Sequence, residues 1–401
     1  MNDEIIDGIL VTGQSNAGYY HGEPGGPKLK VFTDAKSLLM LAGKAGGSVG
    51  GDVGDTFAPA DFAPFIEPTG HGQSPAGMLG LAILHMSKAF GRSDRPLALH
   101  TSFRGDTDLT SMLPDGPFNI HENSRNALLA MSEAAETHNA RFELRMVDMI
   151  QGEGGPFTGY ADTLRRYLSE AFPPLGPSTG LGPRPCFMFS QVNSFTTATE
   201  ANPVVQDQLD VAYEFHGCGV ILAGPMYQFP FYDPGHIIDY GRMMHGEVRA
   251  AAYHHVITCG GIWNPLWPAS QKISRFGTQI LIPFVLPPDS TELFWDEDWI
   301  APVPDKGFSF VQSGGEPVEI ASIELLGSSV LIELSGIPTG IDQRIEYALY
   351  NDPGCFGWAS GRGQLYAKSE RAPPVFAPLG FPVPSTVRHY SVCFRLPVIG
   401  A

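Results

Sequence analysis

Two short polar stretches, far apart in the sequence, carry the residue types best suited to nucleophilic chemistry. The first is the turn GQSN at residues 13–16, which follows the apolar run at residues 8–12 and presents the hydroxyl of Ser15. A serine hydroxyl reacts with a carbonyl when a base takes its proton and N–H groups receive the oxyanion. A strand that ends at a glycine-hinged turn would expose this hydroxyl and free the N–H groups of Ser15 and Asn16. The alternative interpretation is a simple turn after a strand.

The second stretch supplies a candidate base and its carboxylate partner. Asp233 and His236 lie three residues apart on a loop that contains Pro and Gly. This spacing allows the carboxylate to accept the Nδ1–H of the imidazole, so that Nε2 can face a serine. Alternatively, Asp233 caps the helix or turn that follows. Three competing histidines fall within the next predicted helix, where a structural or solvated role is expected: His245, His254 and His255.

A second Gly-Gln-Ser stretch occurs at residues 72–74, but its surroundings differ. The preceding residues do not form an apolar run, and a helical pattern begins at residue 76. Serine is a favoured residue immediately before a helix, where its hydroxyl accepts a backbone N–H. Ser74 is therefore expected to cap this helix rather than to act as a nucleophile.

Strand-like and helix-like segments alternate in the first part of the chain. The predicted strands are near-continuous apolar runs, as expected for parallel strands covered on both faces, at residues 8–12, 96–102, 143–150, 185–192 and 218–223. The predicted helices have apolar residues at helical spacing, at residues 76–90, 124–138, 160–172, 204–215 and 240–255.

This alternation predicts an α/β fold, a three-layer α/β/α arrangement around a parallel sheet. Ligands bind at the carboxyl ends of the strands in such sheets, and both polar stretches fall at that edge. The glycine-rich and acidic segment at residues 43–72 interrupts the alternation, and we expect it to form a cleft wall or lid.

Beyond about residue 262 the pattern changes to alternating apolar and polar residues with few helical stretches. We therefore predict an α/β domain at residues 1–260 and a β-rich, sandwich-like accessory domain at residues 261–401. A hairpin is expected around Leu326 and Gly327. All five tryptophans lie in this second part, where they could stack on sugar rings or fill the core of the sandwich.

The composition excludes several classes of partner. The net charge of −17 opposes binding to phosphate backbones and anionic membranes, so neither nucleic acid nor membrane is an expected partner. No stretch approaches the roughly 20 apolar residues of a membrane span, and the first residues lack the pattern of a signal peptide. Five cysteines without a C-x-x-C pair favour free buried thiols over disulfides or a zinc site.

Three motifs in order carry a family resemblance: GQSN, then QGE at residues 151–153, then D-x-x-H at residues 233–236. Together they resemble the SGNH hydrolase superfamily, a flavodoxin-like fold, and within it the sialate O-acetylesterase and acetylxylan esterase type. The resemblance implies that Ser15 is the nucleophile, His236 the general base and Asp233 its orienting carboxylate. It also implies an oxyanion hole formed by the N–H groups of Ser15 and Gly105 and by the side-chain amide of Gln151.

The chain departs from many such relatives after QGE. Gly154 and Gly155 stand where a serine and an Asp or Asn are common, which bears on the role of Gln151. Glu153, like Asn16, is a candidate supporting residue near the nucleophile turn. Arg104, next to Gly105, could contact substrate or be an exposed loop arginine.

The resemblance implies a serine esterase that removes O-acetyl groups from a carbohydrate through an acetyl-enzyme intermediate, without a metal or organic cofactor. Its expected partner is an acetylated carbohydrate or a small ester. Two alternatives remain at this point. One is a general short-chain carboxylesterase or lipase-like enzyme, and the other is a carbohydrate-binding protein that has lost catalysis.

Overall fold

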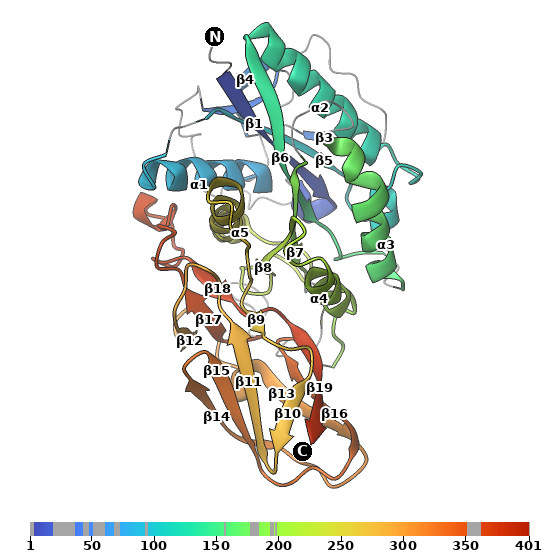
Figure 1. The fold of residues 1–401 in the computed structure, drawn as a ribbon, viewed down its shortest axis with the longest axis vertical. Helices are drawn as coiled ribbons and strands as arrows, with labels where there is room; N and C mark the ends of the chain where they lie inside the picture. Colours follow the sequence, from blue (N-terminus) through green and yellow to red (C-terminus); the bar gives the residue numbers. More distant parts are fainter. Residues whose placement is uncertain are drawn as a thin grey trace.

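The chain has a mixed α/β part followed by a β-rich part (Figure 1). The computed structural model describes residues 4–18, 37–42, 48–50, 61–67, 73–92, 95–155, 158–176, 184–192, 196, 199–350 and 362–400.

A mostly parallel sheet forms the centre of the first part. Within the described residues it has eight strands in the order β4-β2-β5-β1-β6-β7-β8, with β3 beside β5. The edge strand β4 is antiparallel to β2. The strands are β1 (Glu4–Gly13), β2 (Leu38–Leu41), β3 (Ser48–Gly50), β4 (Phe62–Pro64), β5 (Leu97–Phe103), β6 (Ala140–Ile150), β7 (Cys186–Gln191) and β8 (Val220–Pro225).

All five strands predicted for this part are present, and the helices that connect them cover both faces of the sheet. Helices α1 and α5 lie on one face, and α2 and α3 on the other (Figure 1). Two helices continue into π-helical turns, α3 into η4 (Tyr167–Ala171) and α5 into η7 (His254–Thr258). The α-helices are α1 (Pro75–Ala89), α2 (Ile120–Thr137), α3 (Tyr160–Arg166), α4 (Val204–Glu214) and α5 (Asp239–Tyr253). The three-layer α/β prediction is confirmed.

The prediction of a continuous loop at residues 43–72 is wrong at two places. Strands β3 and β4 fall within it and pair with β5 and β2. Both are three residues long and held by backbone hydrogen bonds at the sheet edge, which need little side-chain hydrophobicity. Residues 43–47, 51–60 and 68–72, on which the lid interpretation mainly depends, lie outside the described residues.

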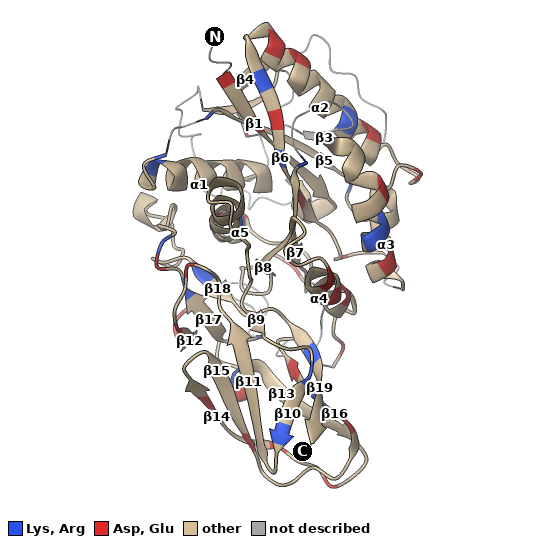
Figure 2. Ribbon diagram, in the orientation of Figure 1, with Lys and Arg blue, Asp and Glu red and all other residues tan. Residues whose placement is uncertain are grey.

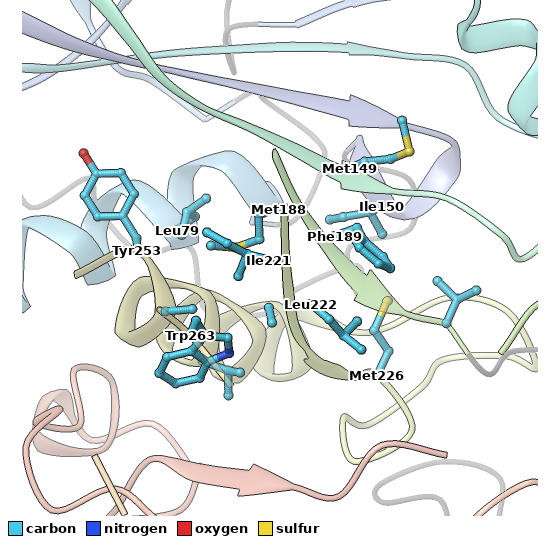
Figure 3. Packing of buried hydrophobic residues seen from close by; sticks show 14 of the residues in the cluster. Leu79, Met149, Ile150, Met188, Phe189, Ile221, Leu222, Met226, Tyr253 and Trp263 are labelled. Atoms are coloured by element: carbon cyan, nitrogen blue, oxygen red, sulfur yellow. The ribbon is translucent and has the colours of Figure 1, made fainter. Parts of the chain in front are cut away.

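Apolar side chains from the sheet and from α1 form the interior. Met188 of β7 and Ile221 of β8 are register partners, and Figure 3 shows them on the side of the sheet where Leu79 of α1 lies. One ion pair crosses this interior: Arg249 of α5 donates to Asp148 of β6, and both side chains are 0% exposed. A buried pair of this kind fixes the helix on the sheet, since either partner alone would leave an uncompensated charge.

The second part consists of strands in two sheets. Within the described residues, one sheet has the order β13-β16-β19-β10-β11-β15-β14 with β9 beside β11, and the other has β12-β17-β18. The strands are β9 (Trp267–Pro268), β10 (Ile273–Phe276), β11 (Gln279–Val285), β12 (Leu293–Trp295), β13 (Phe308–Ser313), β14 (Ile320–Leu326), β15 (Ser329–Leu334), β16 (Ile341–Tyr347), β17 (Leu365–Lys368), β18 (Arg388–Tyr390) and β19 (Phe394–Gly400).

The β-rich character of this part is confirmed, as is the hairpin. Leu326 of β14 pairs with Ser329 of β15 around Gly327, whose φ is 60°. The division of the chain at residue 260 stays a prediction.

The four described tryptophans are buried or partly buried. Trp263 and Trp267 are buried, and Trp267 stacks on Tyr213 with 4.3 Å between ring centroids. Trp295 and Trp299 are partly buried. The interpretation of the tryptophans as core residues is confirmed for Trp263 and Trp267, whereas Trp295 and Trp299 pack partly against the core. Trp358 lies outside the described residues.

The thiols differ from expectation in their exposure. The four described cysteines are free, but Cys218 and Cys259 are exposed, so the prediction of buried thiols is wrong for these two. Both follow the last turn of a helix, where the chain turns at the surface. Cys355 lies outside the described residues.

Charged side chains of both signs are interspersed on the outer helices α2 and α3 (Figure 2). On α3, for example, Arg165 pairs with Asp162 at 2.8 Å and with Glu214 of α4 at 2.8 Å. In the described portion of the chain, no helix has the length and hydrophobicity that crossing a membrane requires.

Candidate active site

Four strands deliver the candidate residues to one edge of the parallel sheet. Gly13, the last residue of β1, is register partner to Phe103 of β5 and to Ile150 of β6. The residues that follow these strands, and the loop that follows β8, therefore converge at the carboxyl ends of the strands. This convergence brings Ser15, Gly105, Gln151 and the loop with Asp233 and His236 to the same region.

The turn after β1 requires glycine and holds the serine rigidly. Gly13 has φ of 143°, and a Cβ at this position would lie 1.9 Å from the carbonyl oxygen of Ile150. The N–H of Gln14 donates to the same oxygen at 3.1 Å, after which Ser15 begins the short helix η1 (Ser15–Ala17). Ser15 is 8% exposed, so little more than its hydroxyl reaches the surface.

Ser15, His236 and Asp233 form a continuous hydrogen-bonded chain. The Oγ of Ser15 lies 2.9 Å from Nε2 of His236, and Nδ1 of His236 lies 2.8 Å and 2.9 Å from the two carboxylate oxygens of Asp233. An ionised carboxylate can only accept, so Nδ1 carries the ring proton and Nε2 can receive the serine proton. This is the arrangement that a serine nucleophile and its base require.

The carboxylate of Asp233 is held in its ionised form. Partial burial raises its pKa, but hydrogen bonds from the His236 ring and from the backbone N–H groups of Gly235 and His236 outweigh burial, so the pKa is lowered. Asp233 Oδ1 accepts each of the two N–H groups at 2.8 Å. The same carboxylate therefore shapes the loop and orients the imidazole.

Asn16 joins the serine turn to the histidine loop. Its Nδ2 donates to the carbonyl oxygen of Gly235 at 2.7 Å, and its Oδ1 accepts the N–H of Ile237 at 3.2 Å, so it brackets His236 on both sides. Asn16 also donates to Oε1 of Glu153 at 2.7 Å. Because these side chains are fully buried, they fix the distance between nucleophile and base.

Burial controls the protonation of Glu153. Removal from water raises its pKa to about 7, although the hydrogen bond from Asn16 and the nearby His236 act in the opposite direction. Since the pKa in the folded chain exceeds the ordinary value, folding favours the protonated carboxyl. The stabilising contribution of protonated Glu153 to the free energy of unfolding is therefore full below about pH 4.5. This contribution is lost as the pH rises to about 7.

We therefore expect Glu153→Gln to reduce the dependence of stability on pH. The wild-type chain should lose on the order of a few kcal/mol of unfolding free energy from this group between pH 4.5 and pH 7, and the neutral amide should not. Melting curves at pH 5 and pH 8 measure the difference. The exposed change Glu136→Gln is the matched control, and a pH dependence in Glu153→Gln equal to that of the control would refute the assignment.

The remaining candidate residues surround this core. Gly105 follows β5, where the N–H of Arg104 donates to the carbonyl oxygen of Gly13 at 3.2 Å, so the Gly105 backbone adjoins the serine turn. The guanidinium of Arg104 lies 3.8 Å from the ring centroid of Phe118, a cation–π contact that anchors the side chain. Arg104 is half-buried, so the interpretation of this residue as an exposed loop arginine is wrong.

Gln151 contacts the serine turn through the side chain of Gln14. Its Nε2 donates to Oε1 of Gln14 at 3.4 Å and to the carbonyl oxygen of Thr107 at 3.3 Å, and its Oε1 has no partner among the described residues. Of the two glycines after QGE, only Gly155 has a steric reason: its φ is 105°, and a Cβ on it would lie 2.5 Å from Cβ of Asp108, whereas a Cβ on Gly154 would meet only ordinary contacts.

Ser74 has the capping role that its surroundings predicted. It is the N-cap of α1, where its Oγ accepts the N–H of Gly77 at 2.9 Å and donates to Glu67 at 3.0 Å. It is not part of the hydrogen-bonded chain of Ser15.

The β-rich part supports the histidine loop from outside, which the sequence did not indicate. The indole Nε1 of Trp299 donates to the carbonyl oxygen of Gln228 at 3.1 Å. The hydroxyl of Tyr227 donates to the backbone carbonyl oxygen of Ser391 at 2.9 Å. The guanidinium of Arg362 lies 5.8 Å from the ring of Phe231. Nothing in the local sequence distinguishes these partners from ordinary core residues.

Comparisons with known proteins were made on the whole chain. No protein-family model and no curated protein sequence matches it. Among solved structures, it is similar to a carbohydrate acetylesterase from Xanthomonas citri, with a TM-score of 0.61 and 13% identity over 97% of this chain and 80% of that chain. The chain shares the fold of this acetylesterase. Because the match covers nearly the whole chain, the shared fold includes the β-rich part.

Two further similarities are weaker. A protein from Arabidopsis thaliana matches with a TM-score of 0.42 and 15% identity over 62% of this chain and 97% of that chain. NanS matches with a TM-score of 0.39 and 12% identity over 64% of this chain and 98% of that chain. Within the described residues, no group of three or more His, Cys, Asp or Glu side chains is placed to hold a metal ion.

Proposed function

We propose that this chain is a serine esterase of the SGNH type that removes O-acetyl groups from a carbohydrate. The observation that carries the proposal is the hydrogen-bonded chain from Ser15 through His236 to Asp233 at the carboxyl edge of the sheet. The esterase fold supports the reaction class, since the structural neighbour that covers most of the chain acts on acetylated carbohydrate according to its description.

In the proposed reaction, Ser15 attacks the acetyl carbonyl while Nε2 of His236 takes its proton. The imidazolium, stabilised by Asp233, then protonates the sugar oxygen as the C–O bond of the ester breaks, which leaves an acetyl group on Ser15. Water, deprotonated by the same imidazole, attacks the acetyl carbon; the bond to Ser15 Oγ breaks, the imidazolium returns the proton to this oxygen, and acetate is released. Both half-reactions return His236 to its neutral state, so the cycle balances without a further group.

The oxyanion needs donors that are in place before the reaction begins. We assign this role to the N–H groups of Ser15 and Gly105, which follow the ends of the paired strands β1 and β5. The amide of Gln151 is the proposed third donor. Its present hydrogen bonds, at 3.3 Å and 3.4 Å, are longer than usual N–H···O distances and therefore weak, so exchanging one of them for a charged oxygen costs little.

For this donor, we expect Gln151→Ala to lower kcat by about 10²- to 10³-fold with little change in KM. The donor acts on charge that develops in the transition state, whereas a glutamine that bound substrate would mainly raise KM. Steady-state kinetics with 4-nitrophenyl acetate measures both constants. A kcat near that of the wild type would leave only the two backbone N–H groups as donors.

The carbohydrate as substrate is tested by the release of acetate. The wild-type chain is incubated with acetylated xylan, an O-acetylated sialoside, and 4-nitrophenyl esters of two, four and eight carbons, with Ser15→Ala as background. We expect acetate from at least one acetylated carbohydrate and a preference for the two-carbon ester. Hydrolysis of the nitrophenyl esters alone would favour a general carboxylesterase. No hydrolysis of any substrate would favour a binding protein.

A further inference from the structure

A cavity of about 270 Å³ lies at the far end of α5 from the triad. Helix α5 begins three residues after His236, and its 15 residues span ~22 Å. The cavity lies between the C-terminal end of α1, the π-helical turn η7 and segments of the β-rich part. Single π-helical turns within helices are often found at functional sites. The cavity is thus separate from the candidate active site.

The walls of this cavity are largely aromatic and apolar. The indole of Trp263 and the ring of Phe90 line it, together with the methyl groups of Ala251 and Ala372. Trp263 is 3% exposed and lies beside α5 (Figure 3), with its ring 5.3 Å from that of His389 in an edge contact. Such walls fit a small ring better than a phosphate or another compact ion.

The cavity is rich in hydrogen-bond donors, although the rings of His254 and His255 and the carboxylate of Asp289 also line it. The Nε1–H of Trp263 is buried and has no hydrogen-bond partner among the described residues. A buried donor without a partner is costly, so an acceptor at this position would stabilise the protein. Arg92 and Arg371 add two guanidinium groups to the lining. Each guanidinium has five N–H donors, of which Arg92 uses two described ones, toward Thr258 and Cys259.

The acidic group of the cavity is already satisfied. Burial raises the pKa of Asp289, but His389 and the Ser369 hydroxyl outweigh this and lower the pKa to about 2. The carboxylate lies 3.1 Å from Nε2 of His389 and also accepts the hydroxyl of Ser369. A sugar, whose hydroxyls must donate as well as accept, would compete with His389 and Ser369 for this carboxylate. A carboxylate needs only donors.

We propose that this cavity binds a small aromatic carboxylate. The ring packs against Trp263 and Phe90, and the carboxylate accepts hydrogen bonds from Nε1 of Trp263 and from the guanidinium of Arg371. The site joins the α/β part to the β-rich part, since Phe90 belongs to the former and Arg371 to the latter. Binding here is independent of ester hydrolysis.

Calorimetric titration with phenylacetate tests this site. The Ser15→Ala chain is titrated beside the wild type, so that the result does not depend on catalysis. We expect one saturable site per chain in both, and at least about tenfold weaker binding of phenylacetamide, which has the same ring but no charge. Trp263→Phe keeps an aromatic ring and loses the N–H, and should weaken phenylacetate binding by about tenfold or more.

The controls separate a specific site from general effects. Trp295→Phe removes a tryptophan that does not line the cavity and should leave the affinity unchanged. If Trp263→Phe does not fold, the exposed change Arg371→Gln provides the test and should also weaken binding about tenfold. The proposal is overturned if phenylacetate does not saturate, if phenylacetamide binds equally well, or if neither variant changes the affinity.

Discussion

Replacement of Ser15 by alanine is expected to lower kcat for ester hydrolysis by about 10⁴-fold or more without unfolding the chain. The change removes the hydroxyl that lies 2.9 Å from Nε2 of His236, while the backbone of the turn is fixed by Gly13 and Gln14. Kinetics with 4-nitrophenyl acetate gives kcat, and thermal melting shows whether the fold is retained.

Ser74→Ala is the matched control, since Ser74 follows the same Gly-Gln pair in sequence but caps α1. Loss of this cap should cost about 1 kcal/mol of stability and leave turnover near that of the wild type. If Ser74→Ala is the inactive variant and Ser15→Ala is active, the assignment of the nucleophile fails.

The change Asp233→Asn is expected to reduce kcat by about 10⁴-fold with little effect on KM. The asparagine oxygen can still accept the N–H groups of Gly235 and His236, so the loop should keep its shape. The new NH₂ group would donate to Nδ1 of His236, which moves the ring proton to Nε2. The imidazole would then face Ser15 with a proton and could not act as its base. Steady-state kinetics and a melting curve on the same preparation test both halves of this expectation.

Asp162→Asn, on the exposed surface of α3, provides the comparison for the loss of one carboxylate. It should match the wild type in kcat and KM. Activity within tenfold of wild type in Asp233→Asn would contradict the role of Asp233, whereas a large fall in melting temperature would show that the carboxylate chiefly holds the loop.

The parts of the fold that could be predicted from sequence are those in which local pattern and burial agree. The strands that became β5 and β8 are buried and largely apolar because helices cover both of their faces, although β5 also buries His100, Thr101 and Ser102. The site followed from the same reasoning, since the ends of parallel strands must meet and Asp233 and His236 have the spacing to pair on one loop. Ser74 could be recognised as a cap because no apolar run directly precedes it and a helical pattern follows it.

The parts that could not be predicted depend on contacts between distant residues. Strand β3 is stabilised by pairing at the edge of β5, which leaves no periodic signal in three residues. The side chain of Gln191 hydrogen-bonds both the N–H and the carbonyl of Cys393, 202 residues away. The role of Glu153 depends on its hydrogen bond from the distant Asn16. The burial of the tryptophans likewise depends on neighbours that are distant in the sequence.

The support that Tyr227 and Gln228 receive from Ser391 and Trp299 has a consequence for the order of events during synthesis. Ser15 and His236 are both synthesised before Ser391, which completes the outer support of the loop that carries the base. Activity should therefore appear only once residue 391 has been added and has folded into place. Chains arrested before residue 391 are expected to show little hydrolysis.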